Sequence, residues 1–450
     1  MMSPLPASSA TVPGVEAAFR TARAEAEARD CADPLGRFRE RFLLNEETIN
    51  LDGNSLGSMP RAVAERMERV LKQEWADGLI RSWGGAEWFR LPEIAGDRIA
   101  PLIGAGQGEV VVGDSTSVNL FKCMAAALAM RPERRVLVAQ ADNFPTDNYI
   151  AQGLAELVPG VTLRAVDTGQ ALIEAIDSSV AAVVLSHVHY RSAAIEDMPA
   201  INRAAGASGA LTVWDLSHST GAVPVDLGGS GADFAVGCTY KYLNGGPGAP
   251  AFCWVSPRHL PNARQPLSGW MGHQSPFAFD YGYRPAEGVR RFVCGTPQIL
   301  GLSALDESLK LWSEVDLPAL FRKSRELTSF FISLVEQTCA EYGLTLASPR
   351  DPAKRGSHVI LRCEHGLPVM RALAASQNAA DLVLTGDALM AVVEAIDVAR
   401  SARRRALENF GFAALYVRFA DVVRAVEALH RTLATRSWNR EEFNQETVVT

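Results

Sequence analysis

Short apolar runs recur between residues 110 and 255, and they constrain the fold of this 450-residue chain more than any other feature. Helix-like stretches separate several of the runs, for example 119–130 and 169–176. Strands that alternate with helices predict an α/β fold with a mainly parallel sheet that is covered on both faces. The runs are Val110–Val112, Val136–Val138, Ala181–Leu185, Leu211–Trp214, Phe234–Val236 and Ala251–Val255.

Polar side chains follow three of these runs. Asp215 and His218 come after one run, Lys241 after another and Ser186 after a third. In open α/β sheets, ligands bind beyond the carboxyl ends of the strands. We therefore expect these side chains to lie at one edge of the sheet.

The length of the chain predicts two domains. We expect a large domain at 60–310 that contains the sheet and its ligand-binding edge, and a smaller α+β C-terminal domain at 311–450. The N-terminal segment 1–59 is predicted to pack with the small domain. Helical spacing of apolar residues is typical of Pro60–Asp77 and of the stretch after Phe419. Helices are also predicted for the Ala/Glu/Arg-rich stretch Ala17–Arg29, for Gly301–Val315 and for Ala319–Tyr342.

Composition excludes several classes of partner. The net charge of −7 argues against binding to nucleic acid or to an anionic membrane surface. The seven cysteines are scattered without a C-x-x-C pair, so neither a metal site nor a disulfide framework is expected. No apolar run reaches the length of a membrane span, and the first 30 residues contain no continuous apolar segment. We expect a cytoplasmic enzyme or binding protein.

Lys241 and Asp215 together indicate a cofactor. Lys241 lies between Tyr240 and Tyr242 in the glycine-rich string GCTYKYLNGGPGAP, an apolar setting that makes an amine a competent nucleophile and base. Asp215 ends an apolar run, where a carboxylate must be paired. An amine that condenses with an aldehyde and a carboxylate that pairs with a ring nitrogen are what pyridoxal phosphate requires. A surface lysine and a helix N-cap are the alternatives.

Other residues could complete such a site. Thr116 and Ser117 open a predicted helix after the first strand, where backbone N–H groups favour an anion, although Ser/Thr caps are common. Phe144 could stack on a ring or simply pack, and His218 could line the site or lie behind it. Trp270 and Thr296 lie in glycine-bearing loops, where functional and packing roles are both open.

Eight strings, in order, resemble the kynureninase family of fold-type-I, class V pyridoxal-phosphate enzymes. The similarity runs from about Asp30 to about Ala374 and returns at 411–429. The strings are LDGNSLGSMP (51–60), EWADGLIRSW (74–83), GDSTSVNLFK (113–122), NFPTDNYIAQGL (143–154), WDLSHSTGAVPVDL (214–227), GADFAVGCTYKYLNGGPGAP (231–250), SGWMGHQSPF (268–277) and RRFVCGTPQIL (290–300).

The resemblance implies roles for individual residues. Lys241 matches the lysine that binds the cofactor, and Asp215 the partner of the pyridine nitrogen. Trp270 and Thr296 match contacts near the phosphate that are donated across a homodimer interface, and Ser55 and Trp83 match positions near the substrate. Further cofactor contacts are implied for Thr116, Ser117, Phe144, Pro145, Thr146, Asp147, Ser186, His218 and Tyr240.

The reaction that the resemblance implies is hydrolytic cleavage of a carbon–carbon bond. The family cleaves the Cβ–Cγ bond of L-kynurenine or 3-hydroxykynurenine, which yields anthranilate or 3-hydroxyanthranilate and L-alanine. Lys241 would act as the base and Tyr240 as a proton donor. The resemblance also implies a place in tryptophan catabolism and NAD biosynthesis.

The sequence departs from the family before the string that begins at Phe410. Family members carry an arginine there that binds the substrate carboxylate, whereas this chain has Asn409. Asparagine cannot replace a bidentate Arg–carboxylate pair. Either a residue of Arg403–Arg405, in the longer and helix-like segment 377–409, restores the contact, or the substrate or the rate differs. A lyase, desulfurase or transaminase of the same fold and a weakly active or inactive homologue therefore remain alternatives.

Overall fold

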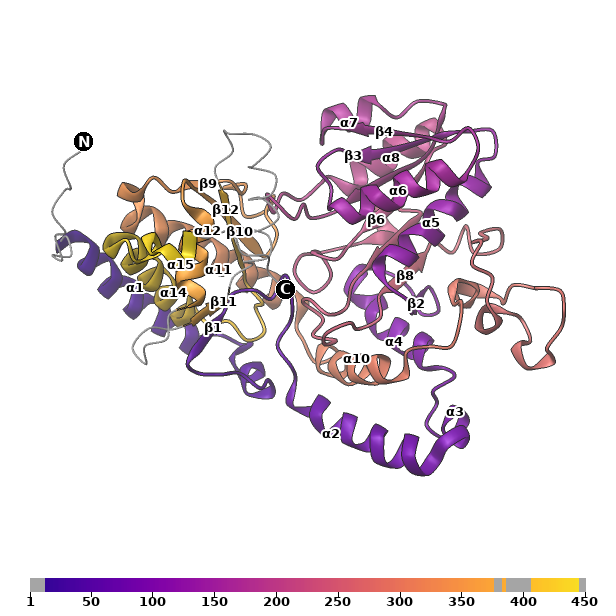
Figure 1. Ribbon diagram of the computed structural model, residues 1–450, viewed down its shortest axis with the longest axis horizontal. Coiled ribbons are helices and arrows are strands. Elements are labelled where there is room, and N and C mark those ends of the chain that lie inside the picture. The colour runs from indigo at the N-terminus through magenta and orange to yellow at the C-terminus, as the bar shows by residue number, and fades with distance from the viewer. Residues whose placement is uncertain (1–12, 376–382, 386–405, 445–450) are drawn as a thin grey trace. The chain divides into compact units, whose positions relative to one another are not determined.

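The computed structural model describes residues 13–375, 383–385 and 406–444 (Figure 1). The chain forms two compact units. Unit 1 comprises Met1–Ser55, Arg191–Ala193 and Asp316–Thr450, and unit 2 comprises Leu56–Tyr190 and Ala194–Val315. The chain therefore passes between the units at 55/56, 190/191, 193/194 and 315/316. The predicted domains at 1–59, 60–310 and 311–450 stay a prediction.

A seven-stranded sheet forms the centre of unit 2. Strand β8 is antiparallel to both of its neighbours, whereas the other six strands run in one direction. All six strands predicted from apolar runs are present, and the predicted α/β class is confirmed. In spatial order the strands are β2 (Val110–Val112), β8 (Phe252–Val255), β7 (Phe234–Gly237), β6 (Leu211–Asp215), β5 (Val180–Ser186), β3 (Val136–Gln140) and β4 (Thr162–Val166).

Strand β4 was not predicted, because it lies at the sheet edge and its side chains are exposed or half-buried. Strand β5, by contrast, is buried along its whole length near the middle of the sheet. A continuous apolar run is the pattern of a strand covered on both faces, whereas an edge strand needs no such run. Within this seven-stranded sheet, the missed strand is thus the one with the weakest hydrophobic signal.

Crossover helices connect the parallel strands. Crossover connections between parallel strands are right-handed. The face that a crossover helix covers therefore depends on the direction in which the chain advances along the sheet, and helices from opposite directions lie on opposite faces. By this rule α5 and α6 cover one face while α7 and α8 cover the other, and α5 packs against α6 as α7 does against α8. The bounds are α5 (Thr116–Met130), α6 (Pro145–Leu157), α7 (Gln170–Glu174), α8 (Met198–Ser208) and α9 (Leu227–Ser230).

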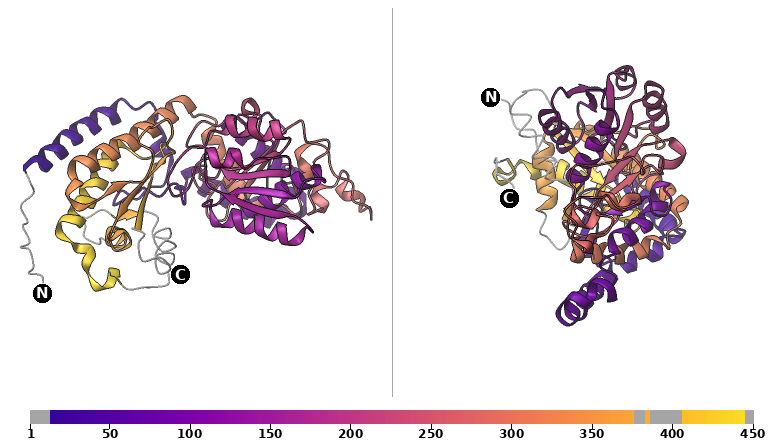
Figure 2. Two further views of the ribbon diagram at one scale, coloured as in Figure 1. Left: turned by 90° about the horizontal axis from the view of Figure 1, so that it is seen from above. Right: turned by 90° about the vertical axis from the view of Figure 1, so that its right-hand side faces the viewer.

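The remaining helices of unit 2 include one departure from prediction. The stretch 60–77 is not a single α-helix, because α2 (Arg61–Arg69) continues as a π-helix, η2 (Val70–Gly78). Figures 1 and 2 show this segment projecting from the sheet of unit 2 as an arm. The others are η3 (Leu79–Arg81), α3 (Ser82–Gly85), α4 (Leu91–Ile99), η4 (Ala100–Ile103), η5 (Trp270–Gly272), η6 (Pro276–Ala278), η7 (Gly288–Phe292) and α10 (Ile299–Trp312).

Unit 1 contains an antiparallel sheet in the order β12-β10-β9, and β1 pairs with β11 in parallel. Its core includes Phe331, Phe410 and Phe412, whose rings pack together. The strands are β1 (Thr48–Asn50), β9 (Thr345–Leu346), β10 (His358–Cys363), β11 (Val383–Thr385) and β12 (Ala406–Gly411), and the helices are α1 (Pro13–Cys31), η1 (Gly36–Arg41), α11 (Leu317–Thr338), η8 (Ala340–Tyr342), α12 (Gly366–Ala374), α14 (Phe419–Thr435), η9 (Ser437–Asn439) and α15 (Glu441–Asn444).

The helix-like character expected for 377–409 is wrong where the structure describes this segment. Residues 383–385 and 406–409 are in strands that pair with β1 and β10. Hydrogen bonding to neighbouring strands outweighs local helix propensity, which is a weak determinant. Arg403–Arg405 lie outside the described residues. Among the helices in the described ranges, none is long and apolar enough to cross a membrane.

Candidate active site

The predicted cofactor residues follow strands that end at the same edge of the sheet. Strands β2, β3, β5, β6 and β7 run in one direction, so their carboxyl ends share that edge. This is where an α/β sheet binds ligands. The residues placed there are Thr116 and Ser117 after β2, Phe144 to Asp147 after β3, Ser186 in β5, Asp215 and His218 at and after β6, and Tyr240 and Lys241 after β7.

Lys241 is half-buried among aromatic and imidazole groups. Its Nζ lies 3.0 Å from Nε2 of His218 and 5.9 Å from the ring centroids of both Phe144 and Tyr240. Three of the predicted residues, each from a different strand end, therefore surround the Lys241 amine. The sequence placed them only in separate loops.

Gly57 fixes the backbone on which Lys241 sits. Its N–H donates to the carbonyl of Tyr240 at 2.9 Å. A Cβ at this position would lie 2.1 Å from the carbonyl oxygen of Lys241, so only glycine allows the approach. Ser58 accepts a hydrogen bond from the Asn244 side chain at 3.0 Å. The segment 57–58 thus braces the lysine loop.

Asp147 and Asp215 form a buried carboxyl pair near this amine. Burial raises the pKa of Asp147 well above its usual range, and the neighbouring Asp215 raises it further. Burial also raises the pKa of Asp215, while hydrogen bonds from Ser217 and Asp147 and the charge of Lys241 oppose that shift. Two adjacent buried carboxylates cannot both ionise easily. Asp147 is therefore the protonated member and donates to an ionised Asp215.

Three residues that the sequence did not single out hold this pair. Asn143 donates to Asp147 at 3.1 Å and accepts from Ser186 at 2.6 Å. The N–H of Ser217 donates to Asp215 at 2.7 Å, and the N–H of His187 donates to its carbonyl at 3.0 Å.

Burial lowers the pKa of His187 to about 4, so its ring is neutral at pH 7. Nothing in the local sequence distinguishes such residues from ordinary loop and strand ends.

Tyr240 carries a hydroxyl that stays protonated at neutral pH. Burial raises the pKa of Tyr240 above its ordinary value, and Cys238 and Asp215 raise it further. A phenol in this state can donate a proton or a hydrogen bond but does not act as a resting base.

The N-terminus of α5 offers backbone donors. Ser115 caps the helix by accepting the N–H of Val118 at 3.3 Å. The N–H groups of Thr116 and Ser117 have no partner within the helix, as in any first turn. Both side chains carry hydroxyls and are half-buried. The arrangement suits a phosphate, which a helix N-terminus attracts.

Trp270 and Thr296 lie in neighbouring loops of unit 2. The N–H of Met271 donates to the carbonyl of Cys294 at 3.3 Å, which joins the two segments. Both predicted residues are exposed, Trp270 by 40%. Within the described ranges, no recorded contact joins either of them to Lys241.

The three predicted substrate residues are separated in the chain and differ in their settings. Trp83 packs edge-on against Trp88 at 5.9 Å, and Ser55 is the last residue of the first segment of unit 1. Asn409 is buried in β12, and its Oδ1 has no hydrogen-bond partner among the described residues. Asn54 Oδ1 is in the same state, and a Cβ at Gly411 would touch it.

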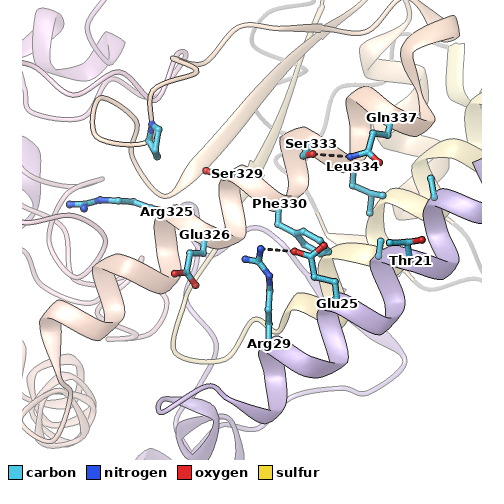
Figure 3. Close-up of a pocket in the computed structure, with 13 residues that line it drawn as sticks. Thr21, Glu25, Arg29, Arg325, Glu326, Ser329, Phe330, Ser333, Leu334 and Gln337 are labelled. Carbon is cyan, nitrogen blue, oxygen red and sulfur yellow. Dashed lines mark hydrogen bonds and ion pairs between the residues drawn. The ribbon is translucent and has the colours of Figure 1, made fainter.

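A cavity of about 370 Å³ lies in unit 1 between α1 and α11 (Figure 3). Arg29 and Glu25, one turn apart on α1, form an ion pair along one wall, and Phe330 of α11 contributes an apolar side chain. It contains none of the predicted site residues. No group of three or more metal-binding side chains occurs in the part of the chain that the structure describes.

Comparison with known proteins decides the family. A kynureninase of Burkholderia pseudomallei is 46% identical over 433 residues, which cover 95% of this chain and 99% of that protein. The chain belongs to the kynureninase family. The kynureninase of Pseudomonas fluorescens is also 46% identical, over 428 residues. The model of the kynureninase C-terminal domain matches residues 320–385.

Solved structures support the fold of this kynureninase family member. An apo cysteine desulfurase of Thermococcus onnurineus superposes with a TM-score of 0.72 at 19% identity, covering 88% of this chain and 98% of that one. The cysteine desulfurase CsdA of Escherichia coli gives 0.69 at 17% identity, with 89% and 98% coverage. At this identity the likeness concerns the fold.

The residues present in this kynureninase homologue fit pyridoxal phosphate. Asp215 is a buried, ionised acceptor that a pyridinium N–H would satisfy, and Lys241 is an amine within the same cluster. Phe144 supplies an aromatic face near that amine, and α5 begins with two hydroxyl residues at the same sheet edge. The donor and acceptor set therefore matches both ends of the cofactor.

Proposed function

We propose that this protein is a kynureninase. It hydrolyses the Cβ–Cγ bond of L-kynurenine, or of 3-hydroxykynurenine, and releases anthranilate, or 3-hydroxyanthranilate, with L-alanine. Pyridoxal phosphate is the cofactor, held by Lys241 and Asp215. The supporting observations are membership of the kynureninase family and the cluster at the carboxyl edge of the sheet.

One observation carries the proposal most directly. Lys241 Nζ lies 3.0 Å from His218 and interacts electrostatically with the buried pair Asp147 and Asp215. A half-buried amine thus lies near two buried carboxyl groups whose environments assign them different protonation states. Such division is typical of acid–base sites.

Each residue has a task in the reaction. The cofactor, when bound, supplies an electron sink for the bonds at Cα and Cβ of the substrate. Asp215 holds a proton on the pyridine nitrogen, and Asp147 keeps Asp215 oriented. The Lys241 amine removes the proton from Cα of the substrate. Tyr240, which stays protonated, donates a proton as the Cβ–Cγ bond breaks after water adds to the γ-carbonyl.

Phe144, Pro145 and Thr146 bound one side of the proposed cofactor site, and Ser186 supports it through Asn143. Phe144 is held edge-on to Tyr190 at 5.4 Å, which fixes its ring. We assign Thr116 and Ser117 to the phosphate, and Ser55, Trp83 and Asn409 to the substrate. These assignments follow the matched motifs.

We further propose that the protein acts as a homodimer in the cytoplasm. Trp270 and Thr296 are exposed, as expected for residues donated to a partner's site. The arm of unit 2 also exposes large apolar side chains, among them Leu71 and Trp75, and exposed apolar patches are typical of interfaces. Nucleic acid and membrane are not expected as partners.

Assay of the purified protein with pyridoxal phosphate and each substrate tests the proposal. Release of anthranilate from kynurenine, or of 3-hydroxyanthranilate from the hydroxylated form, together with equimolar alanine, is the expected result. The ratio of kcat/KM for the two substrates fixes the preference. Cofactor binding without either product would contradict the assigned reaction.

A further inference from the structure

Lys122 is a buried charge close to the proposed phosphate site. Its side chain in α5 is fully buried, and the protein offers its ammonium three acceptors. It forms an ion pair with Asp114, donates to Asn119 at 3.1 Å, and donates to the carbonyl of Phe292 at 2.7 Å. Burying an ammonium group is costly, so its presence in a core position requires a reason.

Asp114 lies next to the start of α5, where its negative charge would repel a bound phosphate. It directly precedes the N-cap Ser115 and adopts φ of 53°, an uncommon value for a residue other than glycine. Its backbone is fixed against β8, since its carbonyl accepts from Ala251 at 3.0 Å. Its carboxylate is partly exposed, by 27%. An unpaired carboxylate at the start of a helix would compete with an anion for the same N–H groups and repel it.

Lys122 also holds the segment that leads to Thr296, which the matched motif assigns to the phosphate of the partner's site. The carbonyl of Phe292 that it binds lies at the end of η7, four residues before Thr296. Asn119 completes the arrangement by donating to the carbonyl of Gly113 at 2.9 Å while accepting from Lys122. One ammonium thus joins the loop at 113–114 to the segment that leads to Thr296.

We propose that Lys122 is a positioning residue for the cofactor phosphate. Its ammonium neutralises the carboxylate of Asp114 beside the N-terminus of α5. Thr116 and Ser117 can then bind a phosphate without repulsion from that carboxylate. The inference rests on the proposed function, because it takes the phosphate to bind at the start of α5. It concerns the affinity for the phosphate end of the cofactor, not the chemistry at the aldehyde.

The test compares pyridoxal phosphate with pyridoxal, which lacks the phosphate. Apoprotein is titrated with each compound, and the two dissociation constants are measured from the absorption change. Lys122→Met should weaken pyridoxal phosphate by about tenfold to 100-fold and alter pyridoxal by less than about threefold. The double variant Asp114→Asn/Lys122→Met should restore pyridoxal phosphate to within about threefold of the wild type.

Lys323→Met is the matched control. Lys323 is also buried, in unit 1, and pairs with Asp33 at 2.7 Å, so its loss removes a buried, ion-paired lysine. It should lower stability but leave the ratio of the two dissociation constants unchanged. A ratio that Lys122→Met does not change, or that the double variant does not restore, would overturn the proposal.

A second variant keeps the test decisive if Lys122→Met does not fold. Asp114→Asn alone removes the opposing charge and keeps the side-chain shape, so the preference for pyridoxal phosphate over pyridoxal should stay or increase. A decrease would overturn the proposal. The wild type separates this inference from the proposed function, since failure to bind pyridoxal phosphate or to cleave kynurenine would reject the function itself.

Discussion

The Lys241 cluster of unit 2 and the Asn409 side of β12 in unit 1 differ in whether their buried polar atoms have hydrogen-bond partners. In the cluster, Asp147, Asp215 and Ser186 all have hydrogen-bond partners. On β12, the Oδ1 atoms of Asn409 and Asn54 are buried without a partner in the described part of the chain. A satisfied network is pre-organised for chemistry, whereas a buried acceptor without a donor carries a cost.

The difference teaches where this chain follows its family and where it departs. The chemical groups are complete within one unit and match the family strings. The departure from the family is at Asn409. Residues 409 and 411 share one side of β12, and Asn54 lies against Gly411. This side of the strand therefore carries the two buried Oδ1 atoms of Asn409 and Asn54. Variants in each region can separate catalysis from substrate binding.

The largest effect is expected for Lys241→Ala. Without the amine, no group in the cluster can link the aldehyde or remove the substrate proton, so kynurenine cleavage should fall by about 10⁴-fold or more. Anthranilate release measures the loss. Lys354→Ala, at an exposed lysine of unit 1, is the control and should keep full activity. Residual activity within tenfold of the wild type would break the assignment.

The second effect concerns the carboxylate. Asp215→Asn keeps the shape but cannot stabilise a protonated pyridine, so kcat should fall by about 10²- to 10³-fold with the protein still folded. Asp233→Asn is the matched control, because Asp233 is buried in the same sheet but bonds His259 and Arg258 instead. That change should lower stability and leave kcat per folded site unchanged. Equal loss of kcat in both variants would argue against a cofactor role for Asp215.

The third effect concerns unit 1. Asn409→Arg should raise kcat/KM for kynurenine by about 30-fold, because an arginine can pair with the substrate carboxylate and Asn54 Oδ1 offers it an acceptor. Most of the gain should appear in KM. Asn409→Lys, a point charge without the planar fork, should gain less. If neither variant changes KM while both keep the wild-type Tm, residue 409 does not contact the substrate.

The smallest effect is a pH-dependent change in the stability of the cofactor-free protein. Because the folded-state pKa of Asp147 is raised, the folded protein binds that proton more tightly, and stability is lost as pH rises from the unfolded pKa to the folded one. Asp147→Asn imitates the protonated form, so its Tm should exceed the wild-type Tm by a few degrees at pH 7. The difference should vanish near the ordinary pKa of an aspartate.

Asp233→Asn should show the opposite sign. Burial opposes ionisation of Asp233, but its His259, Arg258 and Thr212 partners lower its pKa overall, so its stabilisation is present above the unfolded pKa and lost in acid. The variant should therefore be less stable than the wild type at pH 7 and approach it in acid. Thermal unfolding of both variants over a pH series checks the pair of signs.

Much of the fold could be predicted because its signals are local. The six buried strands each have an apolar run, and Lys241 and Asp215 follow two of them. Strand β4 was missed because an edge strand needs no such run. Strands β11 and β12 were missed because their pairing with β1 and β10 is decided by residues far away in the chain. The π-helix at 70–78 interrupts apolar spacing that otherwise reads as one helix.

The site was predictable to the level of motifs but not of contacts. Residue types and resemblance assigned Asp147 and Asp215 separately to the cofactor, yet their shared proton depends on burial and proximity, which no string encodes. Asn143, Ser217 and His187 support the pair through bonds that join distant segments. The role proposed for Lys122 likewise emerged from its complete burial, since a lysine in a string reads as a solvated cation.

The contact of Gly57 with the lysine loop bears on the stage of folding at which Lys241 reaches its final position. The brace that segment 57–58 gives to the lysine loop spans 186 residues of sequence, as the Asn244 to Ser58 bond shows. Contacts between residues so far apart in sequence form late in folding, because the entropy cost of closing the loop comes before the contacts can stabilise the fold. A nascent chain therefore lacks this brace around Lys241 until most of unit 2 has been synthesised and has folded. The time at which the Lys241 amine begins to condense with an aldehyde would then report the completion of folding.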